Sequence, residues 1–288
     1  MHNSVATVPV ETKQPIVTVV MLAMNRPQFL GRAIASVLEQ TISDWELIVV
    51  QDGNHAEVTE ILSAYARADA RIYHVHRTVV GNVSDATNHA LQKASGEFVA
   101  ILDDDDAWCS PTKLAQQINF LKSHPACVAC GGAVIVIDPT GREMLRYQKP
   151  ITDQNIRHSA LLANPIANSS ALFRKAAAAQ IGYYDIKLPV CQDWDFWLRL
   201  GQVGELANLP DYLLKYQFWP SNASVNKYWS NAGFALSVVW RHRKHYPRAG
   251  RGLLFASGYF LNAILPSRLR KSTFQYLSMA RKRLFSKK

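Results

Sequence analysis

Residues 15–125 alternate between short apolar runs and segments in which apolar residues recur at helical spacing, and this alternation constrains the fold more than any other feature. Continuous apolar runs are typical of strands that are buried on both faces of a parallel sheet. Because the links are short, we expect parallel strands joined by right-handed helical crossovers. Pro27 suits the first turn of one helix, and Ser84 can cap another. The predicted strands are 16–22, 45–50, 72–75 and 98–102, and the predicted helices are 27–38, 56–66, 84–94 and 111–121.

The pattern loosens after residue 126, but no Pro-, Gly- or Ser-rich linker separates the two halves. We therefore expect the second half to extend the same sheet rather than to form a separate domain. The predicted strands here are 134–137, 169–173, 206–209 and 213–218, and the predicted helices are 154–162 and 194–200. The pattern divides the chain into a disordered arm at 1–14, two halves of one domain at 15–125 and 126–225, and a helical region at 226–288.

The formal net charge of +10 is distributed unevenly along the chain. No acidic residue follows Asp211, whereas many Lys and Arg residues do, so the basic excess lies in the C-terminal region. No nucleic-acid recognition motif accompanies this charge. We therefore expect no nucleic-acid partner.

The four cysteines are too few and too irregularly spaced for a disulfide framework. Cys127 and Cys130 have the spacing of half a zinc site, but no second pair completes it, so they are expected to pack in a strand. The N-terminal residues 1–15 are polar and do not resemble a signal peptide, and no apolar stretch is long enough to span a bilayer. A reduced, cytoplasmic setting is therefore expected.

Polar residues follow the predicted parallel strands, whose carboxyl ends face one crevice in an open sheet. The most prominent are the consecutive aspartates Asp103–Asp106, directly after the fourth strand. Adjacent carboxylates repel one another unless a cation neutralises them. Oxygen ligation suits Mg²⁺ or Mn²⁺, and such an ion fills its remaining positions with water and phosphate oxygens. The run therefore predicts a divalent metal beside a phosphate-bearing substrate, against the alternative of a solvated acidic turn before a helix.

Three ordered segments resemble the motifs of family 2 glycosyltransferases, and together they extend over about residues 16–220. Residues 17–53 resemble the opening of that family, Gly96–Asp106 resembles its DXD segment, and Gln192–Leu200 resembles its "ED" segment. The resemblance implies an A-type glycosyltransferase fold, which is a Rossmann-like, mostly parallel sheet flanked by helices, here with a basic helical extension. It also implies that residues 15–125 bind a nucleotide sugar and that residues 126–225 bind the acceptor.

The resemblance implies roles for the residues at matching positions. Asp52 would accept a hydrogen bond from the base of the donor nucleotide. Asp105 is the first choice for a direct metal ligand, with Asp103 beside it and nearer the ribose, although the run of four leaves the other two aspartates as alternatives. Asp193 would be the general base. The further implied contacts are Ala23, Asn25, Arg26, Asn82, Asn88, Asp103 and Asp104 for the nucleotide, and Gln192, Asp195 and Trp219 for the acceptor.

Three positions depart from the pattern of the family. Leu22–Asn25 stands where members often show Pro-Thr-Tyr-Asn, so the details of base recognition are expected to differ. Thr87 stands where an Arg commonly precedes the Asn of the third helix, so one phosphate contact is expected to be absent. Tyr216–Trp219 stands where members often show Tyr-Arg-x-His, so no His is expected to add a metal or phosphate contact. Trp219 could instead stack on the face of a sugar.

The implied reaction is a single displacement with inversion, in which a base takes the proton of an acceptor hydroxyl that attacks the anomeric carbon. We expect a nucleotide diphosphate sugar, with UDP favoured, and a saccharide or lipid-linked acceptor in cell-surface polysaccharide or lipopolysaccharide synthesis. Two alternatives stay open, a metal-dependent nucleotidyltransferase and a catalytically silent carbohydrate-binding scaffold. The first would favour a Gly-rich phosphate loop after the first strand, which Met24–Gln28 lacks.

Between two basic clusters, the C-terminal region contains an apolar run at 253–265. This run is too short to cross a bilayer, but it could lie in the interface and attract anionic lipid through its basic flanks. The alternative is a helix that packs on the catalytic body with a solvated basic face. The sequence therefore predicts a protein that is peripheral on the inner face of the cell membrane.

Overall fold

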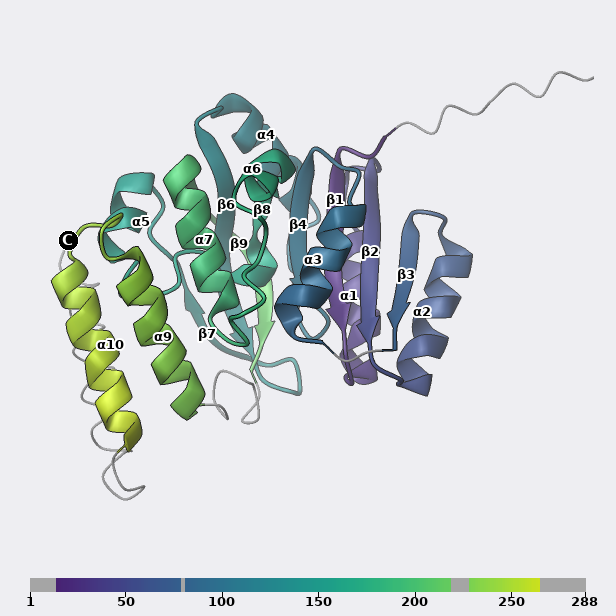
Figure 1. Ribbon diagram of the computed structural model, residues 1–288. Helices are drawn as coiled ribbons and strands as arrows, with labels where there is room; N and C mark the ends of the chain where they lie inside the picture. The colour runs from purple at the N-terminus through teal and green to yellow at the C-terminus, as the bar shows by residue number, and fades with distance from the viewer. Residues whose placement is uncertain (1–13, 79–80, 219–227, 265–288) are drawn as a thin grey trace, which may run out of the picture.

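The computed structural model describes residues 14–78, 81–218 and 228–264. Its centre is a nine-stranded sheet with the strand order β3-β2-β1-β4-β8-β6-β9-β5, and β7 pairs with β6 outside this path. Helices cover both faces of the sheet (Figure 1). The long strand pairings are parallel, whereas the antiparallel pairings are short. The predicted α/β class with a mostly parallel sheet is confirmed.

Strands and helices alternate through the first half as predicted, because buried strands supply continuous apolar runs and each helix buries one apolar face. Asn82, rather than Ser84, caps α3, since its side chain accepts a hydrogen bond from the backbone N–H of Asp85. The elements of this half are β1 (Val17–Ala23), α1 (Pro27–Leu38), β2 (Trp45–Asp52), α2 (Ala56–Ala68), β3 (Ile72–Arg77), α3 (Val83–Lys93), β4 (Phe98–Asp103), β5 (Ala107–Trp108) and α4 (Lys113–Ser123).

The second half extends the same sheet, but its strands differ from the prediction. The two strands predicted at 206–209 and 213–218 form one long strand, β9, whose register against β6 shifts at irregular positions. Three further short or exposed elements, β5, β7 and α6, were not predicted, because none of them carries a periodic apolar pattern. The elements are β6 (Cys127–Ile137), β7 (Glu143–Tyr147), α5 (Asp153–Ser159), a 3₁₀ turn (Asn168–Ser170), β8 (Leu172–Arg174), α6 (Lys175–Gln180), α7 (Gln192–Val203) and β9 (Glu205–Gln217).

Two apolar layers hold the helices against the sheet. Residues of α1, α2 and α4 pack on one face together with Val19, Met21 and Val49. Residues of α3, α6 and α7 pack on the other face together with Val20 and Ile101. Alternate residues of β1 therefore enter opposite layers, as the pleat of a strand requires. This arrangement places the N-terminal ends of α3 and α7 on the same face of the sheet, beside the carboxyl ends of β1 and β4 (Figure 1).

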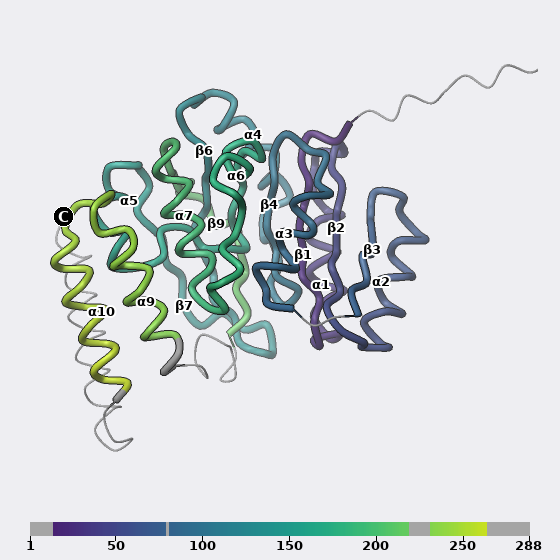
Figure 2. The backbone as a smooth tube through the Cα atoms, viewed as in Figure 1, coloured from purple at the N-terminus to yellow at the C-terminus, as the bar shows by residue number. Residues whose placement is uncertain are grey.

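Two C-terminal helices, α9 (Tyr228–His242) and α10 (Ala249–Ile264), lie at the end of the molecule opposite α2 and β3 (Figures 1 and 2). They pack beside α7 through a third apolar cluster that includes Leu198, Val238 and Val239. Within the described ranges, no helix has both the length and the apolar character that a membrane crossing requires. The boundaries at 125 and 225 stay predictions, as does the disordered arm, which lies outside the described residues apart from residue 14.

Candidate active site

The carboxyl ends of the parallel strands bring the predicted polar residues to one edge of the sheet. In the β1–β4 pairing Leu22 is opposite Asp103, and in the β2–β3 pairing Asp52 is opposite Arg77. Since β1 lies between β2 and β4, the end of β1 is flanked by the predicted base-binding carboxylate and the predicted metal-binding run. The polar residues predicted from strand polarity to share one crevice thus lie at the adjacent ends of these three strands.

The four aspartates have different environments. Asp106 is buried, its Oδ1 accepts a hydrogen bond of 2.8 Å from the backbone N–H of Gln217, and burial raises its pKa well above the ordinary value. Asp104 is also buried, and its Oδ2 accepts a hydrogen bond of 3.0 Å from the backbone N–H of Met24. These two side chains therefore tie the turn after β4 to β9 and to the end of β1.

Arg26 forms ion pairs with both Asp104 and Asp105. Burial raises the pKa of Asp104 to about 6 and that of Asp105 to about 7, although the Arg26 guanidinium works in the opposite direction for both. Arg32, which the sequence did not single out, donates hydrogen bonds of 2.7 Å to the carbonyl oxygen of Asp105 and 2.9 Å to Oε1 of Gln217. The turn is therefore a concentrated acidic site that already attracts cations.

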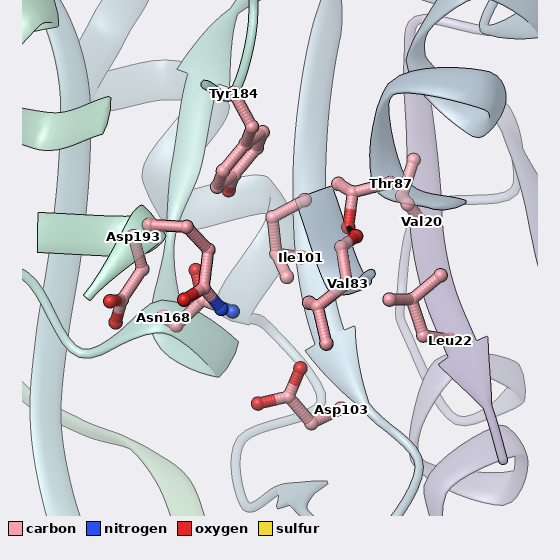
Figure 3. A pocket seen from close by; sticks show the side chains of 10 residues that line it. Val20, Leu22, Val83, Thr87, Ile101, Asp103, Asn168, Tyr184 and Asp193 are labelled. Carbon is pink, nitrogen blue, oxygen red and sulfur yellow. Dashed lines mark hydrogen bonds between the residues drawn. The ribbon is translucent and has the colours of Figure 1, made fainter. Parts of the chain in front are cut away.

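Asp103 differs from the other three, because its partly buried carboxylate accepts no hydrogen bond from the described residues. It faces a small cavity between β1, β4, α3 and α7, and Asp193 faces the same cavity (Figure 3). The structure thus brings together two carboxylates that are far apart in the sequence. The residues that line the cavity are Val20, Leu22, Val83, Thr87, Ile101, Asp103, Asn168, Tyr184, Gln192 and Asp193.

Asp193 lies in the first turn of α7. This helix begins directly after Cys191, whose φ of 58° turns the chain sharply into it. Its Oδ2 accepts a hydrogen bond of 2.6 Å from the Asn164 amide, and its Oδ1 accepts one of 2.8 Å from the backbone N–H of Trp194. Burial is the main cause that raises the pKa of Asp193; the charge of Asp103 adds to this effect, and that of Lys149 opposes it. These two hydrogen bonds orient the Asp193 carboxylate, which also lines the cavity.

The remaining predicted nucleotide contacts divide into two groups. Asp52 accepts a hydrogen bond of 3.0 Å from the backbone N–H of Gly81, and its buried Oδ1 lies 3.8 Å from Nε of Arg77 without a hydrogen-bond donor among the described residues. Asn88, in contrast, both donates to and accepts from the backbone of Tyr184. Asn82, besides its cap, donates to the carbonyl of Ile186. Both amides are therefore bonded to the chain between α6 and α7.

Of the two predicted acceptor residues that the structure describes, Gln192 lies at the cavity with Asp193, and Asp195 does not. Asp195 is fully buried and points toward α9, where it pairs with Arg241 and His242. Ala23 is buried at the end of β1, while the neighbouring Asn25 is exposed. Trp219 lies outside the described residues.

The sequence also failed to single out Asn164, Lys149, Asn168 and Tyr184. Each lies in an irregular segment or at its border, and no periodic pattern or motif marks it. Lys149 Nζ donates a hydrogen bond of 2.7 Å to the carbonyl of Asn164 and so supports the residue that bonds Asp193. Only the order Asn164-Pro165 before a predicted strand could have hinted at a fixed turn.

The carboxylates fit a hard divalent cation. Asp103 and Asp105 offer oxygen ligands, and the acidic turn already binds a cationic group, Arg26. Within residues 14–78, 81–218 and 228–264, no three His, Cys, Asp or Glu side chains form a metal cage. A site of one or two carboxylates, completed by water and phosphate oxygens, is the arrangement that Mg²⁺ generally adopts with nucleotide substrates.

Solved structures share this arrangement of sheet and helices. The mannosyltransferase PcManGT from Pyrobaculum calidifontis, in complex with GDP-Man and Mn²⁺, superposes with a TM-score of 0.64 at 17% identity and covers 96% of this chain and 78% of that one. TarS 1–349 of S. aureus, in complex with UDP, gives a TM-score of 0.63 at 16% identity over 85% of this chain and 70% of that one. At such identities the similarity establishes the fold alone, which is the A-type glycosyltransferase fold.

The sequence comparisons identify the family. Residues 18–182 match the family model described as glycosyl transferase family 2, and the chain belongs to that family. It is 28% identical over 257 residues to the amylovoran biosynthesis glycosyltransferase AmsE of Erwinia amylovora, covering 88% of this chain and 93% of that protein. It is 27% identical over 218 residues to the putative teichuronic acid biosynthesis glycosyltransferase TuaG of Bacillus subtilis, covering 75% and 84%. Membership favours glycosyl transfer over the nucleotidyl transfer that the sequence had left open.

Proposed function

We propose that this chain is an inverting, metal-dependent glycosyltransferase that moves a sugar from a nucleotide diphosphate, UDP in the first instance, to an acceptor hydroxyl. The observation that carries the proposal is the shared cavity of Asp103 and Asp193. One carboxylate belongs to the acidic turn after β4, and the other begins α7. A base and a leaving-group site must lie on opposite sides of the anomeric carbon, and two segments that meet at one cavity can provide this.

The donor nucleotide is proposed to bind across the ends of β1, β2 and β4. Oδ1 of Asp52 is buried and has no hydrogen-bond donor in the part of the chain that the structure describes, so it suits an N–H group of the base. Asp103 and Asp104 would face the ribose and the diphosphate, with Ala23, Asn25 and Arg26 along the end of β1. Asn82 and Asn88 would act from α3, where their present bonds to 184–186 position that segment beside the donor.

Asp105 and Asp103 are the proposed ligands of Mn²⁺ or Mg²⁺. When bound, the cation stabilises the negative charge that develops on the departing nucleoside diphosphate. Arg26 would have to release Asp105 for this ligation, and its guanidinium could then pair with a phosphate group. Asp106 is held by Gln217 and by Ser169, so its proposed role is to fix the turn.

Asp193 is the proposed general base. Its carboxylate would take the proton of the acceptor hydroxyl as that oxygen bonds to the anomeric carbon and the bond to the diphosphate breaks. The proton then lies on Asp193, and the configuration at the anomeric carbon is inverted. Burial raises the pKa of this carboxyl and so makes it a stronger base than an exposed aspartate. Gln192 and Trp219 are proposed to contact the acceptor. Asp195 is proposed to stabilise α7 through its ion pairs with α9.

The proposed acceptor is a saccharide or lipid-linked hydroxyl in the synthesis of a cell-surface polysaccharide or lipopolysaccharide. This part rests on the names of the two relatives, which act in amylovoran and teichuronic acid biosynthesis. Large apolar side chains on the C-terminal helices support a place at the inner face of the membrane, because Trp240, Leu254 and Leu261 are exposed on helices that also carry Arg241 and Arg251.

A screen for release of nucleoside diphosphate tests the proposal, with UDP-, GDP- and dTDP-sugars in the presence and absence of Mn²⁺. We expect turnover or hydrolysis with at least one donor, and loss of that activity when EDTA removes the metal. If no donor is bound or hydrolysed under any condition, the enzyme proposal is wrong.

The base assignment is tested by Asp193→Asn, with Asp211→Asn on the exposed side of β9 as the control. We expect kcat to fall by about 10²- to 10⁴-fold while the affinity for the free nucleotide is kept, because only the proton acceptor is lost. Wild-type turnover by Asp193→Asn would refute the base assignment, whereas a wild-type protein without any turnover would leave the catalytically silent carbohydrate-binding scaffold as the alternative.

A further inference from the structure

The cavity between Asp103 and Asp193 contains a second kind of polar group, the hydroxyl of Tyr184. The Tyr184 side chain is 4% exposed, yet its hydroxyl has no hydrogen-bond partner among the described residues. A buried hydroxyl without a partner costs free energy, and native structures satisfy nearly all such groups. Figure 3 shows the ring reaching from the chain above the cavity toward Asn168 and Asp193.

The position of this ring is fixed. Its face stacks on the ring of Phe196 in α7, with centroids 4.1 Å apart and planes 6° from parallel. The backbone of Tyr184 is held at both its N–H and its carbonyl by the side chain of Asn88. A hydroxyl on a ring held in this way cannot turn elsewhere for a partner, so its direction into the cavity is a property of the fold.

Asn168 supplies a matching acceptor. Its side chain lines the same cavity, and its buried Oδ1 also has no hydrogen-bond donor among the described residues. Burial, together with the charges of Asp193 and Asp103, holds the pKa of Tyr184 well above its ordinary value, so the phenol stays protonated and can donate. The Tyr184 O–H and the Asn168 amide oxygen therefore add an unpaired donor and an unpaired acceptor to the cavity that holds the two carboxylates.

We propose that the Tyr184 hydroxyl and the Asn168 carbonyl oxygen bind a ring hydroxyl of the transferred sugar and so select among donor sugars. A sugar hydroxyl both accepts and donates a hydrogen bond, which is what this pair requires. A site that leaves buried polar groups unpaired rejects a ligand without the matching hydroxyl far more strongly than an apolar pocket could. The inference rests on the proposed transferase function, and it adds residues from the 3₁₀ turn and from the segment before α7 that no motif marks.

The test compares Tyr184→Phe with wild type and with Tyr73→Phe, which removes a hydroxyl from an exposed side chain on β3. Binding of free UDP and GDP is measured beside that of UDP-Glc, UDP-Gal, UDP-GlcNAc and GDP-Man, with Mn²⁺ present. For the donor that wild type binds best, we expect Tyr184→Phe to weaken binding about tenfold, as one lost hydrogen bond implies, and to leave free nucleotide binding unchanged.

A thermal unfolding measurement without ligand separates this role from a structural one. Because phenylalanine removes an unpaired buried hydroxyl without changing the shape of the ring, Tyr184→Phe should melt at the wild-type temperature or above it. A lower melting temperature would mean that the hydroxyl has a structural partner, and the inference would be overturned.

The inference also fails if Tyr184→Phe binds every nucleotide sugar as wild type does, or if wild type binds nucleotide sugars no better than free nucleotides. In both cases the proposed function survives through nucleotide binding. If wild type binds neither nucleotides nor nucleotide sugars, the proposed function fails first and this inference fails with it.

Discussion

At the scale of single residues, the orientation of the proposed base depends on Asn164. Its amide donates the 2.6 Å hydrogen bond to Oδ2 of Asp193, and Lys149 in turn donates to the carbonyl of Asn164. The backbone N–H of Trp194 fixes the other carboxylate oxygen. Without the amide, the carboxylate keeps its place on α7 and its hydrogen bond to Trp194, but Oδ2 is no longer held and can move away from its position at the cavity. Such a displacement of a catalytic group can lower the rate of a reaction by about two orders of magnitude.

We therefore predict that Asn164→Ala lowers kcat by about 10- to 100-fold while the dissociation constant of the free nucleotide stays the same. Steady-state kinetics and calorimetric titration with the nucleotide check the two parts. The matched control is Asn155→Ala, which removes an exposed amide from α5. An unchanged kcat for Asn164→Ala, or an equal loss in both variants, would contradict the positioning role.

The sequence could indicate Asp193 but not Asn164, for a physical reason. Asp193 lies at the start of a helix with a periodic apolar pattern and inside a recognisable motif, so the sequence could indicate both its position and its role. Asn164 lies in the loop between α5 and the 3₁₀ turn, and its partner is 29 residues away. Contacts of this kind depend on how the sheet packs, not on any local pattern. The same holds for Tyr184, because its hydroxyl can be recognised as buried and unpaired only from the three-dimensional structure.

At the scale of elements, Asp195 joins α7 to α9. The carboxylate is fully buried and accepts hydrogen bonds of 2.7 Å from Arg199, 3.0 Å from Arg241 and 2.9 Å from His242. Gln202 orients the imidazole, since its amide nitrogen contacts Nδ1 of His242 at 3.0 Å and also donates to the carbonyl of Leu198. Nε2 of His242 carries the hydrogen that is donated to Asp195. The helix of the proposed base is thus anchored to the C-terminal helices.

Removing the Asp195 carboxylate should lower the free energy of unfolding, and the size of this decrease should depend on pH. Burial alone would raise the pKa of Asp195, but the bonds from His242 and Arg199 outweigh it and lower the pKa to about 2. A depressed carboxyl pKa stabilises the folded state above the unfolded value of about 3.9, and this contribution is lost as the pH falls toward 2. We predict that Asp195→Asn lowers the free energy of unfolding by about 3 kcal/mol at neutral pH.

Urea unfolding at pH 7 and at about pH 3 measures this effect, with Asp211→Asn as the control. The difference in unfolding free energy between wild type and Asp195→Asn should narrow by about 1 kcal/mol at the lower pH, because part of the linkage is then lost. A difference that is the same at both pH values would show that the charge of Asp195 does not stabilise the fold.

Elements with a strong apolar period were predictable, whereas those defined by their neighbours were not. β1 to β4 and the helices between them followed the sequence pattern within a few residues. β7 is exposed along its whole length, and β5 has only two residues, so tertiary pairing alone defines them as strands. Likewise, the long β9 joins two predicted strands because its irregular register lets polar residues interrupt the apolar run without ending the pairing.

At the scale of the whole molecule, the proposed donor site and the proposed membrane contact lie at different positions along the sheet. The proposed nucleotide site lies at the ends of β1, β2 and β4, while α9 and α10 lie at the opposite end from α2 (Figure 1). The chain is acidic overall before residue 211 and strongly basic after it. Among the described basic residues after 211, Arg241 and Arg251 lie on α9 and α10, at the end of the molecule opposite α2. A protein with a basic end is attracted to an anionic surface in a defined orientation, which would leave the proposed donor site free while that end meets the membrane.

We predict that the full chain binds vesicles with about 30% phosphatidylserine, does not bind neutral phosphatidylcholine vesicles, and releases the anionic ones at high salt. Sedimentation with vesicles measures binding. Because each basic side chain near such a surface contributes about 1 kcal/mol, Arg251→Gln on α10 should weaken binding about fivefold, whereas Arg67→Gln on α2 should have no effect. Leu254→Ser tests the apolar contribution, since this side chain is 71% exposed. Equal effects of the two arginine variants would contradict an oriented contact, and a wild-type chain that stays in solution with anionic vesicles would refute membrane association.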